Sequence, residues 1–388
     1  MRGGFCRGKA GGTPGIMSEN DFLGFVRDVS RDPFGQIKKY AAQGRRMAGY
    51  MCTYVPEEFL YAAGLLPIRL LGRATQITKA DRHLQSYCCS HVRGFLEDYM
   101  DGAYNDISAV LFAYTCDTMQ SFYDIFKMNF PEKYIANLNF PVRLDTKSAY
   151  KYALTETLRF KEGIEKFTGK KIGAAELENA VNVYNKNREL VGKLYDLHSA
   201  NPDIFPSATL LQVSLASMFM DKAELNPMIE KYLAGAGAGP AGGAARKRLI
   251  LIGSINLGED IYTLADEYGA TIANDDMCTG RRYFQGLVEK PTDEGILSRY
   301  YNRPHCAAKH LSNTSRGEYI VKLAKAAKAD AAIFDYLKFC DPHAFDYPYM
   351  RKMLESAGFR THLIEVEQSL GQSGQLRTKM QAFIETLK

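Results

Sequence analysis

The sequence predicts an α/β protein with two Rossmann-like parallel-sheet domains and a helical segment inserted between them. Short, continuously apolar runs alternate with amphipathic helical segments in residues 46–138 and again in residues 248–387. Runs of this kind are typical of parallel strands that are buried on both faces. A chain of 388 residues, 46% of them hydrophobic, is long enough to form two cores.

The first half divides into an extension and an α/β domain. Residues 1–16 are rich in Gly and basic residues and lack a core-forming pattern, so we expect a disordered extension and a natural start at Met17. Residues 17–145 form the first α/β domain, which begins with helices broken at Asp32–Pro33. Its strands are expected near residues 46–51, 67–71, 109–114 and 134–138.

The second half begins with helices. Residues 146–233 carry apolar residues at spacings of three and four, which predicts a helical packing segment. Residues 234–247 are mostly Gly and Ala and are expected to be a flexible linker. Residues 248–388 form the second α/β domain, with strands near residues 248–254, 270–276 and 361–365 and another that runs up to Cys340. Its helices are expected over residues 258–269, 316–328, 345–357 and 376–387.

Composition excludes several classes of protein. The net charge of +5 is mild and spread out, which argues against a nucleic-acid surface. No apolar run reaches the roughly 18 residues that a membrane helix needs. The turn at residues 253–258 lacks the G-x-G-x-x-G spacing of a dinucleotide site. Eight cysteines without a secretory signal indicate a reducing cytoplasm, where thiols are more often catalytic or metal-binding than disulfide-bonded.

The cysteines stand at a recurring position, which points to chemistry. Cys52 follows a short apolar strand and precedes a turn and a helix that opens on Glu57 and Glu58. Cys116 and Cys340 each end an apolar run and precede a helical segment. The carboxyl ends of parallel strands are where open α/β sheets bind ligands, and a following helix N-terminus favours a thiolate. We therefore expect these thiols to face one crevice.

A fourth candidate comes from the pair Cys88–Cys89, of which only one side chain can easily point at a given site, and we select Cys89. The four cysteines lack the compact C-x-x-C spacing of a zinc ribbon or small ferredoxin. Ligands from separate strand ends describe a metal centre in the interdomain crevice, and soft thiolates suit iron–sulfur clusters or zinc. From spacing alone, scattered structural thiols are an equally open interpretation.

Six segments resemble a known family. C-T-Y-V-P-E-E-F-L-Y-A-A-G from Cys52, L-Q-S-Y-C-C-S-H-V-R-G around Cys89, Y-T-C-D-T-M-Q around Cys116, D-D-M-C-T-G-R-R-Y-F, K-F-C-D-P-H-A-F-D-Y-P-Y around Cys340 and G-Q-L-R-T-K-M-Q-A-F-I-E are similar to the 2-hydroxyacyl-CoA dehydratases of the D-component type. Benzoyl-CoA reductase subunits belong to the same family. The resemblance runs from about residue 36 to the C-terminus.

The resemblance implies a [4Fe–4S] cluster between the two α/β domains, held by Cys52, Cys89, Cys116 and Cys340. It also implies a homologous second dehydratase subunit and an ATP-hydrolysing iron–sulfur activator protein that injects one electron. The substrate would be an (R)-2-hydroxyacyl-CoA thioester, which loses water through a ketyl radical. Such a protein would act in the cytoplasm, in anaerobic metabolism, as a carbon–oxygen lyase.

The sequence leaves the roles of several further residues open. Cys88, Cys278 and Cys306 are either ordinary thiols near the site or ligands of a larger double-cubane cluster. Glu58 is the candidate catalytic residue, as a carboxylate that faces an open iron or the leaving hydroxyl; alternatively it is only a helix N-terminal charge.

His343 is a metal ligand, a proton donor to the substrate or a turn residue bonded to backbone, and the role of His91 is open in the same way. Arg281 and Arg282 either meet coenzyme A phosphates or form a solvated pair. Two alternative functions also stay open, a benzoyl-CoA reductase-type subunit and a non-catalytic electron relay.

Overall fold

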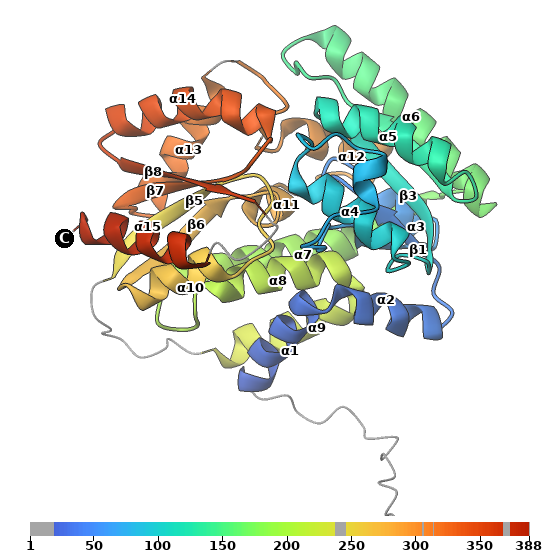
Figure 1. The fold of residues 1–388 in the computed structure, drawn as a ribbon. Coiled ribbons are helices and arrows are strands. Elements are labelled where there is room, and N and C mark those ends of the chain that lie inside the picture. Colours follow the sequence, from blue (N-terminus) through green and yellow to red (C-terminus); the bar gives the residue numbers. More distant parts are fainter. Residues whose placement is uncertain (1–18, 237–245, 305, 313, 368–372, 388) are drawn as a thin grey trace, which may run out of the picture.

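The structure, a computed structural model, describes residues 19–236, 246–304, 306–312, 314–367 and 373–387. The predicted extension at residues 1–16, and residues 237–245 of the predicted linker, lie outside the described residues. Both predicted sheets are present, and they form two lobes that lie side by side (Figure 1).

The first sheet is parallel and has the strand order β2-β1-β3-β4. Its strands are β1 (Met47–Tyr50), β2 (Leu66–Arg69), β3 (Ile107–Tyr114) and β4 (Tyr134–Asn139). All four predicted strands are therefore confirmed. The order reverses between β1 and β3, because β2 lies on one side of β1 and the later strands lie on the other.

The second sheet repeats this topology with the order β6-β5-β7-β8, again all parallel. Its strands are β5 (Lys247–Gly253), β6 (Ala270–Asp276), β7 (Ala331–Leu337) and β8 (Arg360–Val366). The strand order reverses between β5 and β7. Each sheet thus has one topological switch point, where open α/β sheets form their ligand crevices.

Helices cover both faces of each sheet. Alternate residues of β3 point to opposite sides: Leu111 packs in one hydrophobic cluster and Phe112 in another. In the first lobe these helices are α3 (Glu57–Ala62), α4 (Ser90–Met100) and α5 (Asp117–Asn129), with a short 3-10 helix at Ala80–Arg82. In the second lobe they are α10 (Asp260–Glu267), α11 (Arg281–Phe284), α13 (Ser315–Ala326), α14 (Asp341–Ser356) and α15 (Ser373–Glu385).

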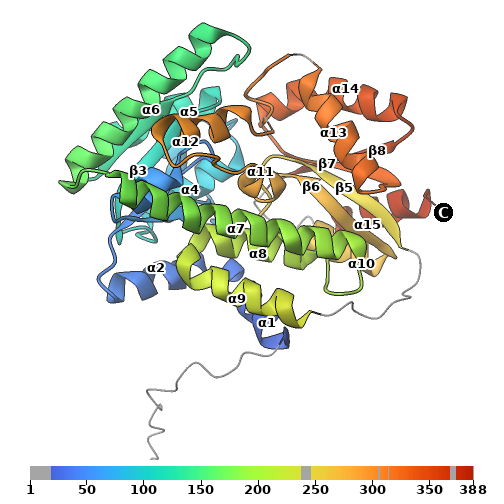
Figure 2. The same cartoon turned by 180° about the vertical axis from the view of Figure 1, so that it is seen from behind.

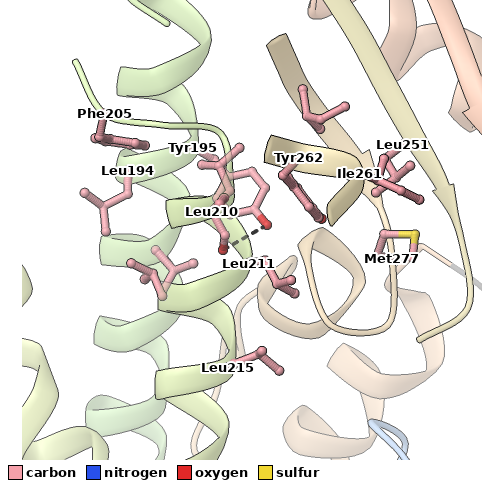
Figure 3. Close-up of a cluster of buried hydrophobic side chains, with 14 of the residues drawn as sticks. Leu194, Tyr195, Phe205, Leu210, Leu211, Leu215, Leu251, Ile261, Tyr262 and Met277 are labelled. Carbon is pink, nitrogen blue, oxygen red and sulfur yellow. Dashed lines mark hydrogen bonds between the residues drawn. The ribbon is translucent and has the colours of Figure 1, made fainter. Parts of the chain in front are cut away.

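A helical layer joins the two lobes. It contains α1 (Glu19–Arg31), α2 (Pro33–Ala42), α7 (Ala174–Ala200), α8 (Ala208–Phe219) and α9 (Lys222–Gly235). Helix α6 (Lys147–Thr168) instead packs beside β4 in the hydrophobic cluster of the first sheet. The long helix α7 crosses the rear of both lobes (Figure 2). Figure 3 shows Tyr195 of α7 and Leu211 of α8 facing the second lobe, where Tyr262 and Met277 pack in the same cluster. Among the described residues, no helix is both long and apolar enough to cross a membrane.

The sequence analysis did not anticipate α12 (Asp293–Asn302). The Thr292 side chain accepts a hydrogen bond from the Gly295 amide and caps this helix. Ile296 and Tyr300 of α12 pack in the hydrophobic cluster of the first sheet rather than that of the second. The chain after β6 therefore returns across the crevice and ties the second half of the sequence to the first lobe.

The first testable prediction concerns Gly72, which lies in close contact with α4. A Cβ atom at this position would lie 2.2 Å from the carbonyl oxygen of His91 and 2.3 Å from the amide nitrogen of Phe95. Because both are backbone atoms, Gly72→Ala must displace α4, and we expect a loss of about 3 kcal/mol or more in unfolding free energy. Urea denaturation measures this loss.

Gly192 in α7 is the matched control, since a Cβ atom added at this position would meet open space. Gly192→Ala is expected to raise the unfolding free energy by about 0.5–1 kcal/mol through helix propensity. Equal effects of the two substitutions would contradict the packing described here.

Candidate metal centre

The predicted cysteines lie at the carboxyl ends of the strands that flank the two switch points. Cys52 follows β1 and Cys116 follows β3, the two strands between which the first sheet reverses its order. Cys340 follows β7, at the reversal of the second sheet. Parallel strands bring their carboxyl ends to one edge, so the two sheets present these thiols at their ligand-binding edges.

Three of the four thiols occupy helix N-cap positions. Cys89, Cys116 and Cys340 directly precede α4, α5 and α14, which are helices of 11, 13 and 16 residues. The first amides of a helix and its dipole both favour negative charge at this point. Each thiol therefore lies where a thiolate is stabilised.

A cavity of about 570 Å³ brings these three N-caps together, with Cys89, Cys116 and Cys340 in its wall. The remaining wall comes from the first turns of α5 and α14 and from the segment before α13. These other lining residues are Thr115, Asp117, Thr118, Gln120, Val142, Ala307, Ala308, His310, Phe339, Asp341, Pro342, Phe345, Asp346 and Tyr349. Figure 1 shows α5 and α14 on the same side of the molecule, one in each lobe.

The backbone before Cys340 is strained. Phe339 has a φ of 65°, in the left-handed region that side chains other than Gly and Asn rarely adopt. A bulky residue in this conformation costs about 1–2 kcal/mol. The turn is closed by a 3.0 Å hydrogen bond from the Cys340 amide to the Leu337 carbonyl. Strain of this kind next to a functional residue is consistent with a loop shaped to place the Cys340 thiol.

The thiols affect one another electrostatically. Burial raises the pKa of Cys116, a backbone hydrogen bond from Met119 opposes this, and the neighbouring thiols of Cys89, Cys52 and Cys306 add to the increase, so that the pKa is about 12. Burial also raises the pKa of Cys340 well above its usual range, together with Cys89 and Cys116. The predicted four cysteines therefore lie in one neighbourhood, even though Cys52 is not among the residues that line the cavity.

The additional cysteines divide into two groups. Cys88 does not line the cavity, whereas its neighbour Cys89 does. Cys278 follows β6, and its sulfur accepts a hydrogen bond of 3.3 Å from Arg282. Burial raises the pKa of Cys306, Cys278 adds to this increase, and Arg282 opposes it. Cys278 therefore extends the thiol neighbourhood from the second sheet, and Cys306 extends it from beside the hydrophobic cluster of the first sheet.

Two buried cations lie beside the thiols. Lys309 is fully buried, and Arg282 is 2% exposed. The Arg282 guanidinium donates to Asp276 at 2.5 Å as well as to Cys278. Burial lowers the pKa of Lys309 to about 8, and the thiols of Cys306, Cys52 and Cys116 act in the opposite direction. Neither interpretation of Arg282 from the sequence is correct, because it is neither solvated nor open to a coenzyme phosphate.

The two histidines have structural surroundings. His91 is buried, its Nδ1 lies 3.4 Å from the Gly72 amide nitrogen, and burial followed by Arg69 lowers its pKa to about 3. His343 is also buried, with Nδ1 3.4 Å from the Cys340 sulfur. Burial, Arg282 and Arg316 lower the pKa of His343 well below its ordinary value, so this ring is neutral and contacts the thiol.

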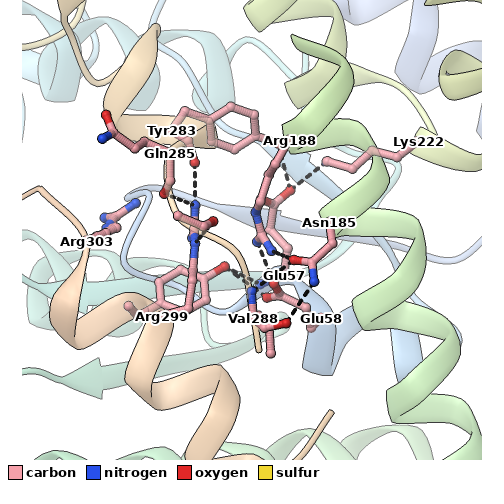
Figure 4. A network of polar contacts seen from close by, with 12 residues as sticks. Glu57, Glu58, Asn185, Arg188, Lys222, Tyr283, Gln285, Val288, Arg299 and Arg303 are labelled. Carbon is pink, nitrogen blue, oxygen red and sulfur yellow. Dashed lines mark hydrogen bonds and ion pairs between the residues drawn. The ribbon is translucent and has the colours of Figure 1, made fainter. Parts of the chain in front are cut away.

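Glu57 and Glu58 begin α3 and are held in a buried ionic network (Figure 4). Glu58 is fully buried, with Oε1 2.5 Å from Arg188 and Oε2 2.9 Å from the Tyr300 hydroxyl. Glu57 accepts from Lys222 at 2.9 Å. These contacts orient both carboxylates towards α7, α9 and α12, and neither glutamate lines the cavity. The catalytic role predicted for Glu58 stays a prediction.

The residues fit a thiolate-bound group. Among the described residues, no three His, Cys, Asp or Glu side chains converge on a point that suits a single metal ion. A [4Fe–4S] cubane does not require such convergence, because each of its four thiolates binds a different iron atom. The soft sulfur donors, their helix N-cap positions and the adjacent buried cations match what a cubane requires.

The fold and the site together define a class of protein: a two-lobed parallel α/β protein with a thiol-lined crevice at the carboxyl ends of its strands. The chain belongs to the family described as 2-hydroxyglutaryl-CoA dehydratase, D-component, which matches residues 52–387. The family predicted from the sequence is thereby confirmed.

Characterised relatives match nearly the whole chain. The beta subunit of (R)-phenyllactyl-CoA dehydratase from Clostridium sporogenes is 30% identical over 374 residues, covering 96% of this chain and 100% of that subunit. The beta subunit of lactoyl-CoA dehydratase from Anaerotignum propionicum is 27% identical, covering 94% of this chain and 98% of the subunit. A benzoyl-CoA reductase subunit from Thauera aromatica is 27% identical, covering 90% of this chain and 93% of that subunit.

The second prediction concerns the buried pair of Glu58 and Arg188. Because both side chains are almost fully buried, Arg188→Met leaves an uncompensated carboxylate and is expected to cost about 3–5 kcal/mol of unfolding free energy at pH 7. Burial raises the pKa of Glu58, but Arg188 and Arg299 together lower it by more than burial raises it. The net shift of this pKa is therefore downward. The pair therefore stabilises the wild type above the ordinary pKa of glutamate and loses this effect as the pH falls through the lowered value.

Urea denaturation at several pH values tests this pair. The difference between wild type and Arg188→Met should shrink as the pH falls towards 4, because the isolated carboxyl becomes protonated. Lys186→Met on the same helix is the control, since its partner Glu230 is 47% exposed. Lys186→Met should leave the unfolding free energy nearly unchanged at every pH, because solvent screens an exposed ion pair. A pH-independent difference for Arg188→Met would contradict the assignment.

Proposed function

We propose that this chain is an iron–sulfur subunit of a 2-hydroxyacyl-CoA dehydratase, holding a [4Fe–4S] cluster through Cys52, Cys89, Cys116 and Cys340. The observation that carries the proposal is the gathering of thiols from both lobes at one cavity, in a chain of this family. The relatives are named as beta subunits of dehydratases that act on acyl-CoA thioesters, which supports a homologous partner subunit for this chain as well.

A cluster held by Cys52, Cys89, Cys116 and Cys340 would supply the single low-potential electron, received from an ATP-hydrolysing activator, that radical dehydration of an (R)-2-hydroxyacyl-CoA thioester requires. The chain's own residues provide the surroundings. The N-termini of α4, α5 and α14 stabilise the thiolates, because the helix dipoles favour negative charge at these positions. The place of action that we propose is the cytoplasm, because a reducing compartment keeps the eight cysteines of the chain available as thiols.

A second candidate function is an electron relay, in which the cluster passes its electron to a catalytic partner subunit. The number of available thiols favours the relay function, because four cysteine thiolates can bind all four iron atoms and leave no iron open to a substrate carbonyl. The similarity to a benzoyl-CoA reductase subunit keeps ring reduction as a third candidate.

The third prediction is that anaerobically purified protein contains about four irons per chain. Cys116→Ser should lose most of this iron, because serine replaces a soft thiolate with a hard and poorly ionised hydroxyl. Cys88→Ser is the matched control, since Cys88 lies outside the cavity wall, and it should keep the wild-type iron content. Wild-type protein without iron would refute the proposal. About eight irons would instead indicate the double-cubane arrangement.

The fourth prediction separates the catalytic from the relay function. With the dithionite-reduced protein, a catalytic cluster should change its electron paramagnetic resonance spectrum when an (R)-2-hydroxyacyl-CoA is added. The (S)-enantiomer is the control and should leave the spectrum unchanged. An intact cluster that responds to no thioester would favour the relay.

A further inference from the structure

The buried lysine Lys309 lies in the segment between α12 and α13, which reaches from the second half of the chain to the first lobe. Its Nζ donates to two backbone carbonyls, those of Tyr114 at 3.1 Å and Phe140 at 2.8 Å. Tyr114 ends β3, two residues before Cys116. The neighbouring His310 amide donates to the Val142 carbonyl at 2.8 Å and keeps the segment in register with the first lobe.

The charge of this lysine has no carboxylate partner. Within the described part of the chain, no Asp or Glu oxygen lies within 4.0 Å of Lys309, although the side chain is fully buried. An ammonium group in such a place is costly unless a counter-charge lies nearby. The ionisable groups that act on it are the thiols of Cys306, Cys52 and Cys116. Deprotonated sulfur is therefore its natural counter-charge.

We propose that Lys309 is the counter-cation of the thiolate-bound cluster and raises the reduction potential of that cluster. This inference rests on the proposed function, because it requires a cluster on these thiolates. A cubane with four thiolates carries net negative charge and becomes more negative on reduction. A fixed cation nearby consequently stabilises the reduced state more than the oxidised one.

The lysine also has a positioning role through the same two hydrogen bonds. These bonds hold Tyr114, the last residue of β3, and Phe140, the first residue after β4, against the segment that carries Cys306. Arginine preserves both the charge and the donors, glutamine preserves only a donor, and methionine preserves neither. These three substitutions separate charge from packing and hydrogen bonding.

Lys133, which directly precedes β4, provides a control at the other end of β3. Its Nζ donates to the carbonyls of Asn105 and Ile107, both at 2.9 Å, at the amino end of β3. It therefore makes the same kind of contact as Lys309, but at the strand end opposite to the thiols. Lys133→Met removes such a cation without altering the charge around the cavity.

The experiment is an anaerobic redox titration of purified, iron-loaded protein, followed by electron paramagnetic resonance. At the wild-type midpoint potential, Lys309→Met and Lys309→Gln should lower the ratio of reduced to oxidised cluster about tenfold, which corresponds to a midpoint about 59 mV more negative. Lys309→Arg and Lys133→Met should titrate within twofold of wild type.

If a variant fails to retain the cluster, its iron content shows whether the charge of Lys309 or only its packing is required. Loss of iron from Lys309→Met and Lys309→Gln, but not from Lys309→Arg, supports the counter-cation role. Loss from all three variants overturns it, since packing would then be the requirement. An unchanged midpoint in a fully loaded Lys309→Met also overturns it and leaves the proposed function intact. Wild-type protein without any cluster would refute both proposals together.

Discussion

The structure depends on one arrangement: helices that begin directly after parallel strands and point their N-termini at a shared crevice. Cys116 in the first lobe and Cys340 in the second each lie between the end of a strand and the first residue of a helix. Because strand ends and helix starts coincide in this topology, the thiols receive the positive ends of the helix dipoles without any further device. The repetition of one strand order in both sheets gives the crevice two similar walls.

Burial makes the lobes interdependent. The thiol of Cys52 lies in the first lobe, and the residue after it, Thr53, accepts a 3.0 Å hydrogen bond from Arg303 of the second half. Glu58 pairs with Arg188, which belongs to the joining helix α7. Charges taken out of water require such partners, so separating the lobes would expose or isolate several of them. We infer that this network holds the crevice at a fixed width and supports the placement of Cys52.

The fold could be predicted largely from sequence because apolar strands and amphipathic helices have different periods. Helix α12 could also have been predicted, since Thr292 followed by Asp293 and Glu294 is a recognisable helix start. The packing of α12 against the first lobe could not have been predicted, because the residues of a helix do not specify which of two hydrophobic cores its apolar face joins.

The same contrast holds at the site. The position of Cys116 and Cys340 around one cavity follows from the rule for strand ends, and the sequence analysis anticipated it. Cys89 lines the same cavity, but it follows a loop rather than a strand, and the sequence analysis selected it from the Cys88–Cys89 pair. Lys309 and Arg282 were not identified as buried cations, because isolated basic residues are usually solvated and their partners lie far away in the sequence. The surroundings of Glu58 likewise depend on α7 and α12, which approach it only in the folded chain.

The central claim is that thiols from both lobes hold one cluster. An anaerobic crystal structure with anomalous diffraction measured at the iron edge tests it most directly. We expect a single compact group of iron peaks in the crevice, within bonding distance of sulfur atoms from Cys116 in the first lobe and Cys340 in the second. Iron bound by cysteines of only one lobe, or a crevice without iron in protein that retains its metal in solution, would contradict the claim.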